Sequence, residues 1–151
     1  MRTKINLLAL AAVCTIVVFV SCKKEDPAPT KTEMLCDKNW KLTAATIDPP
    51  YYIGGTYITN FYAQMQDCQK DDIYKYLKEG VSIKTENSKC DPSDPATESG
   101  TWEFRNNETE LWEDGEYSKL EELTNTKLRV TIPIDTINNI VYYMTGTFEA
   151  Q

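Results

Sequence analysis

The sequence predicts an all-β domain, an antiparallel up-and-down barrel of eight strands that follows a removable export signal. Three observations predict the barrel. From residue 40 onward, short segments alternate apolar and polar residues, as half-buried strands do. Turn signals such as Asp114-Gly115 separate most of these segments, and consecutive hairpins favour a meandering barrel over a sandwich. No segment keeps a helical period for more than one or two turns.

The first strand is predicted over residues 40–47, with Trp40, Leu42 and Ala44 on one face. Asp48-Pro49-Pro50 is expected to end it, because proline cannot donate a hydrogen bond to a strand ladder. Residues 48–71 then form a long connection with a helical turn expected near its end. Connections of this length usually carry a function or a small element of their own.

A hairpin follows, with strands at 73–78 and 81–85 around the turn Lys78-Glu79-Gly80. Alternation predicts that Val81 and Ile83 face inward.

The next strand is expected over 100–105, after a loop at 86–99 that is rich in Asp, Pro and Ser. Trp102 and Phe104 share one face of this strand.

Segments 109–113 and 116–123 flank Asp114-Gly115, which is a strong hairpin signal. The alternation in the second segment is imperfect and indicates a bulge. This hairpin is acidic, which we interpret as solubility and protection of a strand edge. The acidic residues are Glu108, Glu110, Glu113, Asp114 and Glu116.

The last two strands are predicted at 127–134 and 140–148. The residues expected to face inward from the first are Leu128, Val130, Ile132 and Ile134. Those that share one face of the second are Ile140, Tyr142, Met144 and Phe148.

Composition excludes several functions. The chain of 151 residues has 16 basic and 23 acidic side chains, a formal net charge of −7, and no histidine. The charge argues against nucleic-acid binding, which needs a basic face. The lack of histidine excludes His-dependent nucleophiles and His-ligated metals. No carboxylate pair is marked out as an acid and a base, so we predict no enzyme, no cofactor and no metal.

The start of the chain has the parts of a secretory signal peptide. Arg2 and Lys4 are positive, and the apolar run Leu7–Val20 is shorter than the roughly 20 residues that span a membrane. Phe19-Val20-Ser21-Cys22 resembles a bacterial lipobox. The resemblance implies cleavage before Cys22 and the attachment of acyl chains such as palmitate to it. The alternative is an ordinary secreted protein with no lipid on Cys22.

The chain therefore divides into a signal peptide (1–21), a lipid-anchored tether (22–33) and a barrel domain (34–151). The tether is charged and contains two prolines, as extended spacers do. Lys23-Lys24-Glu25-Asp26 resembles the export tag of surface lipoproteins of the Bacteroidota. We expect an outer-membrane protein, surface-exposed or periplasmic, whose membrane contact is through its acyl chains. A plain solvated spacer is the alternative reading of the tether.

Three cysteines remain for the folded domain, Cys36, Cys68 and Cys90. An odd number means one bridge and one free thiol, or an intermolecular pair. We predict a Cys68–Cys90 bridge, because both lie in polar segments rich in turn residues. Cys36 lies at the start of an apolar strand and is expected to be free and buried.

A family resemblance covers about residues 34–150. Its motifs, in chain order, are Trp40-Lys41-Leu42-Thr43, Cys68, Asp71-Asp72, Lys78-Glu79-Gly80, Cys90-Asp91, Gly100-Thr101-Trp102, Leu123-Thr124 and Leu128. Their order and spacing resemble the lipocalin-like domain lipoproteins of the Bacteroidota. The resemblance implies an eight-stranded barrel and a small apolar ligand. Lys38 departs from the lipocalin signature, which has glycine two residues before the tryptophan.

Two groups of aromatic residues are candidates for binding a small apolar or amphipathic ligand. The inward group either lines a cavity or fills the barrel: it is Trp40, Trp102, Phe104 and Tyr142. The loop group either contacts a ligand, with 48–71 as a lid, or packs over the barrel end: it is Tyr51, Tyr52, Tyr57, Phe61 and Tyr62.

Asp67, Asp71 and Asp72 are oxygen donors of the kind that calcium prefers. They lack the spacing of an EF-hand, and we interpret them as solvated acids beside the predicted disulfide.

Two functions stay open at this point. One is a lipocalin-like carrier or sensor of a small ligand, and the other is a structural or protein-interaction module with a filled barrel. The inward residues separate them, because small side chains among large ones leave space and stacked aromatic rings do not.

Overall fold

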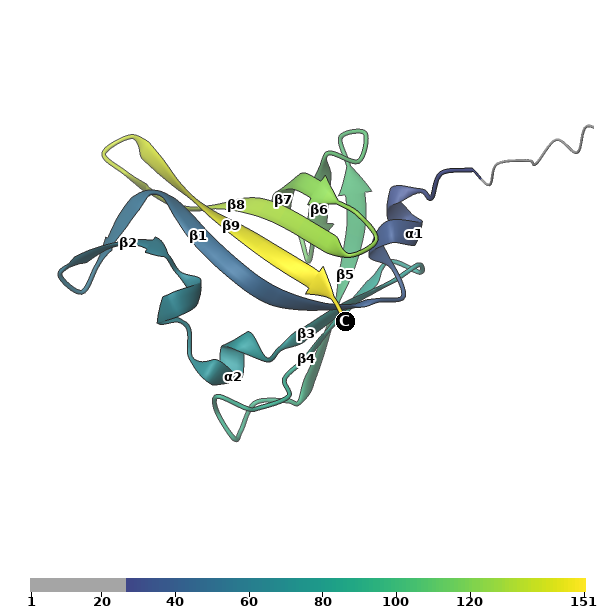
Figure 1. Cartoon of the computed structure of the whole chain (residues 1–151), viewed down its shortest axis with the longest axis horizontal. Helices are drawn as coiled ribbons and strands as arrows, with labels where there is room; N and C mark the ends of the chain where they lie inside the picture. The colour runs from purple at the N-terminus through teal and green to yellow at the C-terminus, as the bar shows by residue number, and fades with distance from the viewer. Residues whose placement is uncertain (1–26) are drawn as a thin grey trace, which may run out of the picture.

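The computed structural model describes residues 27–151, which form a closed antiparallel barrel (Figure 1). Successive barrel strands pair with one another, and β1 completes the circle by pairing with β9 along one edge and with β3 along the other. The eight barrel strands are β1 (Asn39–Ile53), β3 (Ile73–Leu77), β4 (Val81–Thr85), β5 (Thr97–Arg105), β6 (Glu110–Glu113), β7 (Glu116–Leu123), β8 (Lys127–Ile137) and β9 (Ile140–Ala150). The predicted fold class is confirmed, and the architecture is compatible with a lipocalin-like barrel.

The predicted signal peptide, residues 1–21, and the predicted lipidation site Cys22 lie outside the described residues. Within the part of the chain that the structure describes, no helix is long and apolar enough to cross a bilayer.

The long connection expected at 48–71 is mostly regular structure. Strand β1 continues to Ile53, and a turn at Gly54-Gly55 leads into β2 (Thr56–Asn60), which pairs with the end of β1. The prediction that Pro49-Pro50 ends the strand is therefore wrong. The prolines are tolerated because they lie where the β1–β2 register shifts, between Thr46 and Tyr51.

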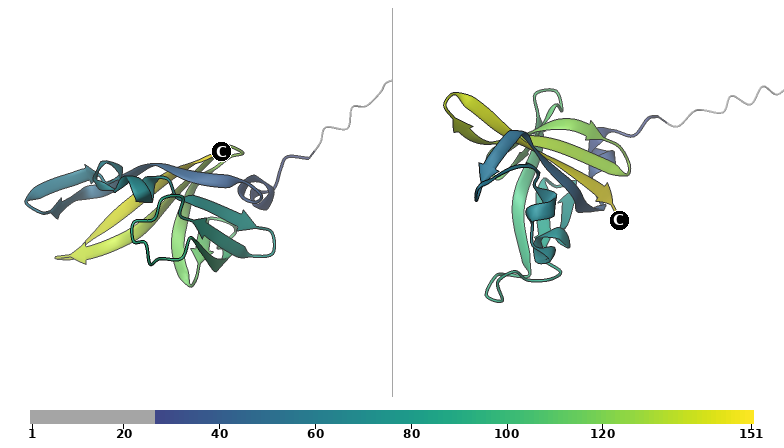
Figure 2. Two further views of the ribbon diagram at one scale, coloured as in Figure 1. Left: turned by 90° about the horizontal axis from the view of Figure 1, so that it is seen from below. Right: turned by 60° about the vertical axis from the view of Figure 1, so that its left-hand side comes forward.

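A 3₁₀ turn, η1 (Tyr62–Gln64), and a short helix, α2 (Asp67–Lys70), complete this connection and match the helical turn expected there. The β1–β2 hairpin and the β8–β9 hairpin both project away from the side where the described chain begins (Figure 1, Figure 2).

A short helix, α1 (Lys31–Leu35), precedes the barrel and was not predicted. It takes up the last residues of the expected tether. Thr30 caps it, with its hydroxyl accepting from the amide of Glu33 and the Glu33 carboxylate accepting from the amide of Thr30. Leu35 is fully buried, and its carbonyl accepts from Trp40 Nε1 at 2.8 Å. The helix therefore closes one end of the barrel.

The core lies at this closed end. It consists of Leu35, Cys36, Trp40, Tyr76, Trp102, Leu111 and Leu128. Trp102 meets Tyr76 and Phe104 edge to face, with ring centroids 5.7 and 5.4 Å apart. Such contacts add about 0.5–1.5 kcal/mol each beyond the burial of area. Cys36 is free and buried, as predicted.

Irregularities in two long strands change which residues face the interior. A register shift between Leu42 and Ala44 leaves Ala45 buried (2% exposed) in place of Ala44. A second shift, between Pro133 and Asp135, accompanies the exposure of Ile134. The predicted inward positions of Ala44 and Ile134 are wrong because one extra residue inverts the alternation of side chains.

Strand β4 also faces opposite to prediction. Its register places Ser82 opposite the buried Tyr76 and Lys84 opposite Tyr74. Directly paired residues share a face of a sheet, so Ser82 and Lys84 face the interior and Val81 and Ile83 face outward. The predicted hairpin at Lys78-Glu79-Gly80 is confirmed.

Candidate functional site

An apolar cavity of 210 Å³ lies next to the core, one step further along the strands from the closed end. On β1 it begins at Leu42, just beyond the core residue Trp40, and on β8 it begins at Val130, just beyond Leu128. Its walls come from three adjacent strands, β8, β9 and β1, and from Tyr74 on β3. The barrel is thus filled at one end and hollow beyond it.

Two small residues keep this space open. Ala45 faces the interior only because of the β1 bulge, and Gly146 lies opposite it on β9. A Cβ atom at position 146 would lie 3.0 Å from the Phe148 ring and 3.5 Å from Leu42 Cδ1, so a side chain there would take up cavity volume.

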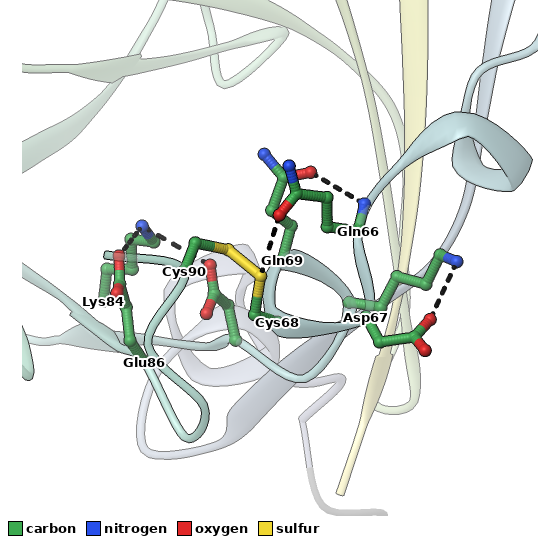
Figure 3. The surroundings of a disulfide bond; sticks show 9 residues. Gln66, Asp67, Cys68, Gln69, Lys84, Glu86 and Cys90 are labelled. Carbon is green, nitrogen blue, oxygen red and sulfur yellow. Dashed lines mark hydrogen bonds and ion pairs between the residues drawn. A yellow bond between two sulfur atoms is a disulfide. The ribbon is translucent and has the colours of Figure 1, made fainter. Parts of the chain in front are cut away.

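The remaining lining residues, Phe61 and Met65, do not belong to the sheet. They flank η1 and cover the cavity. The segment is held in place by the Cys68–Cys90 disulfide, which joins α2 to the loop after β4 with a Cα–Cα distance of 5.4 Å (Figure 3). The predicted disulfide is confirmed.

A second, polar cavity of 200 Å³ adjoins the first. It is lined by side chains from β3, β4, β5 and β6, and Tyr74 lines both cavities. The polar groups that line it include Ser82, Lys84, Glu98 and Glu113. The interior therefore offers an apolar and a polar compartment side by side.

The positive charge of Lys84 is balanced by two carboxylates. Its Nζ lies 2.8 Å from Glu86 Oε1 and 3.4 Å from Asp72 Oδ2, beside the disulfide (Figure 3). The hydrogen bond to Glu86 raises the pKa of Lys84, so this ammonium stays charged. Burial raises the pKa of Asp72, which is 5% exposed. Within residues 27–151, Asp72 Oδ1 and Glu86 Oε2 are buried and have no hydrogen-bond partner.

Glu113, at the end of β6, lines the same polar cavity as Lys84. Its Oε2 accepts a hydrogen bond from the Tyr76 hydroxyl at 3.0 Å. Burial raises the pKa of the Glu113 carboxyl, and the same burial, together with the nearby Glu113, raises the pKa of Tyr76. Tyr76 is therefore the proton donor in this pair.

The nine aromatic residues predicted to bind a ligand are dispersed in the structure. Trp40 and Trp102 belong to the core, and Phe104 packs against it. These three rings fill the closed end and do not line the apolar cavity. Tyr142 lies further out on β9, where its ring meets Tyr51 edge to face at 5.0 Å.

The loop aromatics separate in the same way. Phe61 lines the apolar cavity. The Tyr51 hydroxyl donates to Asp135 at 2.6 Å, and Tyr52 packs on Tyr57 at the exposed hairpin tip. Tyr62 lies under the ammonium of Lys70 at 5.5 Å. Of the segment 48–71, the part around η1 covers the cavity, whereas the hairpin projects from the barrel.

Sequence reasoning missed Ala45, Met65, Ser82, Lys84 and Glu113 as site residues. A signal existed for Ser82 and Lys84, because they align with Tyr76 and Tyr74 once the hairpin register is set by its turn. The interpretation of Glu113 as a solvent-facing acid is wrong, because its carboxyl lies against Tyr76.

The three aspartates considered for calcium do not form a site. Asp67 is exposed and paired with Lys70, whereas Asp72 is buried beside Lys84. In the described part of the chain, no group of three metal-ligating side chains is suitably placed to hold a metal ion.

No protein-family model matches this chain, and no curated protein matches its sequence.

Proposed function

We propose that this protein is a lipid-anchored lipoprotein of the outer membrane whose lipocalin-like barrel binds a small apolar or amphipathic ligand. The observation that carries the proposal is the 210 Å³ apolar cavity between the filled end of the barrel and the cover formed by Phe61 and Met65. Apolar cavities with a few polar groups at one side are the usual form of small-molecule sites.

The size of the cavity limits the ligand. Sites for drug-sized molecules are about 300–1,000 Å³, so 210 Å³ suits a short hydrocarbon chain or a single ring. Burying a group the size of a leucine side chain contributes roughly 1.5–3 kcal/mol. Such a ligand binds weakly unless its polar end also finds a partner.

Binding is tested by isothermal titration of the purified domain with octanol, comparing two leucine substitutions. Ala45→Leu fills the cavity and should weaken octanol binding at least tenfold. Ala44→Leu adds the same group on the other face of β1 and should leave binding unchanged. Ile132→Phe fills the same cavity from β8 and should also weaken octanol binding. It provides an independent test if Ala45→Leu fails to fold. Octanol binding that is absent, or equal in all variants, would contradict the proposal.

The membrane anchor is tested separately, by fractionating cells that express the full chain. Cys22→Ser should move the protein from the membrane to the soluble fraction, because acyl attachment needs the thiol and several chains give stable anchoring. Cys14→Ser, within the expected signal peptide, is the matched control. Unchanged membrane retention of the Cys22 variant would contradict the anchor.

A second candidate function is a protein-interaction module. Seven of the eight large hydrophobic residues that are exposed within residues 27–151 lie on the β1–β2 and β8–β9 hairpins, with Tyr57 at 72% and Tyr52 at 61%. Exposed apolar patches of this kind often mark contact surfaces. This function predicts no octanol binding, and self-association in analytical ultracentrifugation that Tyr52→Ser with Tyr57→Ser abolishes.

A further inference from the structure

The polar cavity borders the apolar one at Tyr74. Across β3, β4 and β5, Tyr74, Lys84 and Glu98 are aligned directly opposite one another. The next inward row is Tyr76, Ser82 and Gly100. Tyr74 borders both cavities, and its ring packs edge to face on Phe148 at 5.5 Å. A single ligand that passes Tyr74 would therefore meet hydrocarbon on one side and polar groups on the other.

The charge of the polar cavity favours a cation. Its one lining lysine, Lys84, is shared between Glu86 and Asp72 and has no charge to spare. The acids that line it, Glu98, Glu113 and Asp114, make no ion pair with any residue in 27–151. An anionic ligand would add a like charge to this set, which is unfavourable.

Glu113 has acceptor capacity left over. An ionised carboxylate accepts about four hydrogen bonds, and Tyr76 provides one at 3.0 Å. Glu113 comes from β6, and the titratable or charged groups around it are Tyr74 and Tyr76 on β3 and Asp114 at the start of the β6–β7 turn, with the neutral Ser82 on β4. Glu113 is partly buried, and a carboxylate that loses contact with water is stabilised by pairing with a cation. An ammonium group would supply both the charge and the donors, and charge-assisted hydrogen bonds are about twice as strong as neutral ones.

We propose that the ligand is an amphipathic amine: its ammonium group binds Glu113 in the polar cavity, and its hydrocarbon part lies past Tyr74 in the apolar cavity. This inference rests on the proposed function, and it adds the chemical class of the head group. Glu113 is the residue that sets the preference, and the Lys84–Asp72–Glu86 group excludes anions from the same space.

The inference is tested by titrating the domain with octylamine, octanol and octanoate, which share one hydrocarbon chain and differ in head group. Octylamine should bind at least tenfold more tightly than octanol, and octanoate more weakly than octanol. Glu113→Gln should remove most of the preference for the amine over octanol, because Gln still accepts from Tyr76 but carries no charge to pair with an ammonium group. The octanol affinity of each protein is the reference against which its amine preference is measured, and octanol binding that persists shows that the variant is folded.

Glu103→Gln is the matched control, since it removes the same charge from an exposed glutamate paired with Arg105. It should leave all three affinities unchanged. Equal binding of octylamine and octanol, or an equal loss of amine binding in both variants, would overturn the inference while the proposed function stands on octanol and Ala45→Leu. If none of the three compounds binds, both fail.

Discussion

Trp40 connects the sequence pattern to the closed end of the barrel. It was predicted to face inward, and it is fully buried with its indole nitrogen bonded to Leu35. Alternation alone predicted its face, because the strand is regular from Asn39 to Leu42. The hydrogen-bond partner of the indole, the Leu35 carbonyl, belongs to α1. This helix could not be predicted from apolar periodicity, because it has only five residues and few of them are apolar.

We expect Trp40→Phe to lower the free energy of unfolding by about 1–3 kcal/mol, because the buried Leu35 carbonyl loses its donor and the smaller ring leaves a gap. Chemical denaturation measures this loss. Trp112→Phe is the control, since that indole donates to Glu110 under the guanidinium of Arg105 at the outer surface. A smaller loss for Trp40→Phe than for Trp112→Phe would contradict the assignment of Trp40 to the core.

Glu113 gives a pH dependence whose sign follows from burial. Its pKa in the folded protein is raised above the ordinary value of 4.5, so the folded state holds this proton more tightly than the unfolded chain. The stabilisation is complete below pH 4.5 and is lost as the pH rises through the folded pKa. The wild type should therefore gain stability relative to Glu113→Gln when the pH is lowered from neutral to 4.5.

Thermal unfolding across that range measures the difference, with Glu103→Gln as the control for net charge. A difference between wild type and Glu113→Gln that stays constant with pH would show that the Glu113 carboxyl is solvated.

Among the elements, the eight barrel strands and most of their turns were predictable, whereas β2, the extension of β1 past Pro49-Pro50 and the faces of some strands were not. Asp114-Gly115 and Lys78-Glu79-Gly80 carry local turn signals, and both hairpins form. The bulges in β1 and β8 carry no comparable signal, since they depend on how neighbouring strands coil around the barrel. Ala45 is the clearest case. Strict alternation places Ala44 inside and Ala45 outside, whereas the bulge shifts the pattern by one residue and turns Ala45 into the cavity.

The disulfide should stabilise the cover of the cavity as well as the fold. Cys68 and Cys90 are 22 residues apart, and closing such a loop contributes roughly 3 kcal/mol. We expect the double variant Cys68→Ser, Cys90→Ser to lose about that much stability in denaturant melts. The same double change to alanine, Cys68→Ala with Cys90→Ala, controls for the hydroxyl groups that serine introduces. Full stability of the double variant would show that the bridge does not constrain the chain.

For the whole molecule, the amount of empty space in the barrel decides between a carrier and a filled module. Sequence pattern predicted eight strands because each strand and turn is local, and it predicted large aromatic rings inside. It did not predict that these rings gather at one end, which follows from α1 and the core around Trp40 and Trp102. The hollow part beyond them depends on Ala45 and Gly146, two small residues brought together by the β1–β9 register.

Native mass spectrometry of the full chain, extracted from the membrane of its host, shows directly whether the barrel holds a ligand. We predict a mature protein that begins at Cys22, carries acyl chains, and retains a small amphipathic molecule by non-covalent binding. Ala45→Leu should lack that molecule, and Ala44→Leu should keep it. A fully lipidated wild-type protein with no bound molecule, or one retained equally by both variants, would contradict a ligand in the barrel.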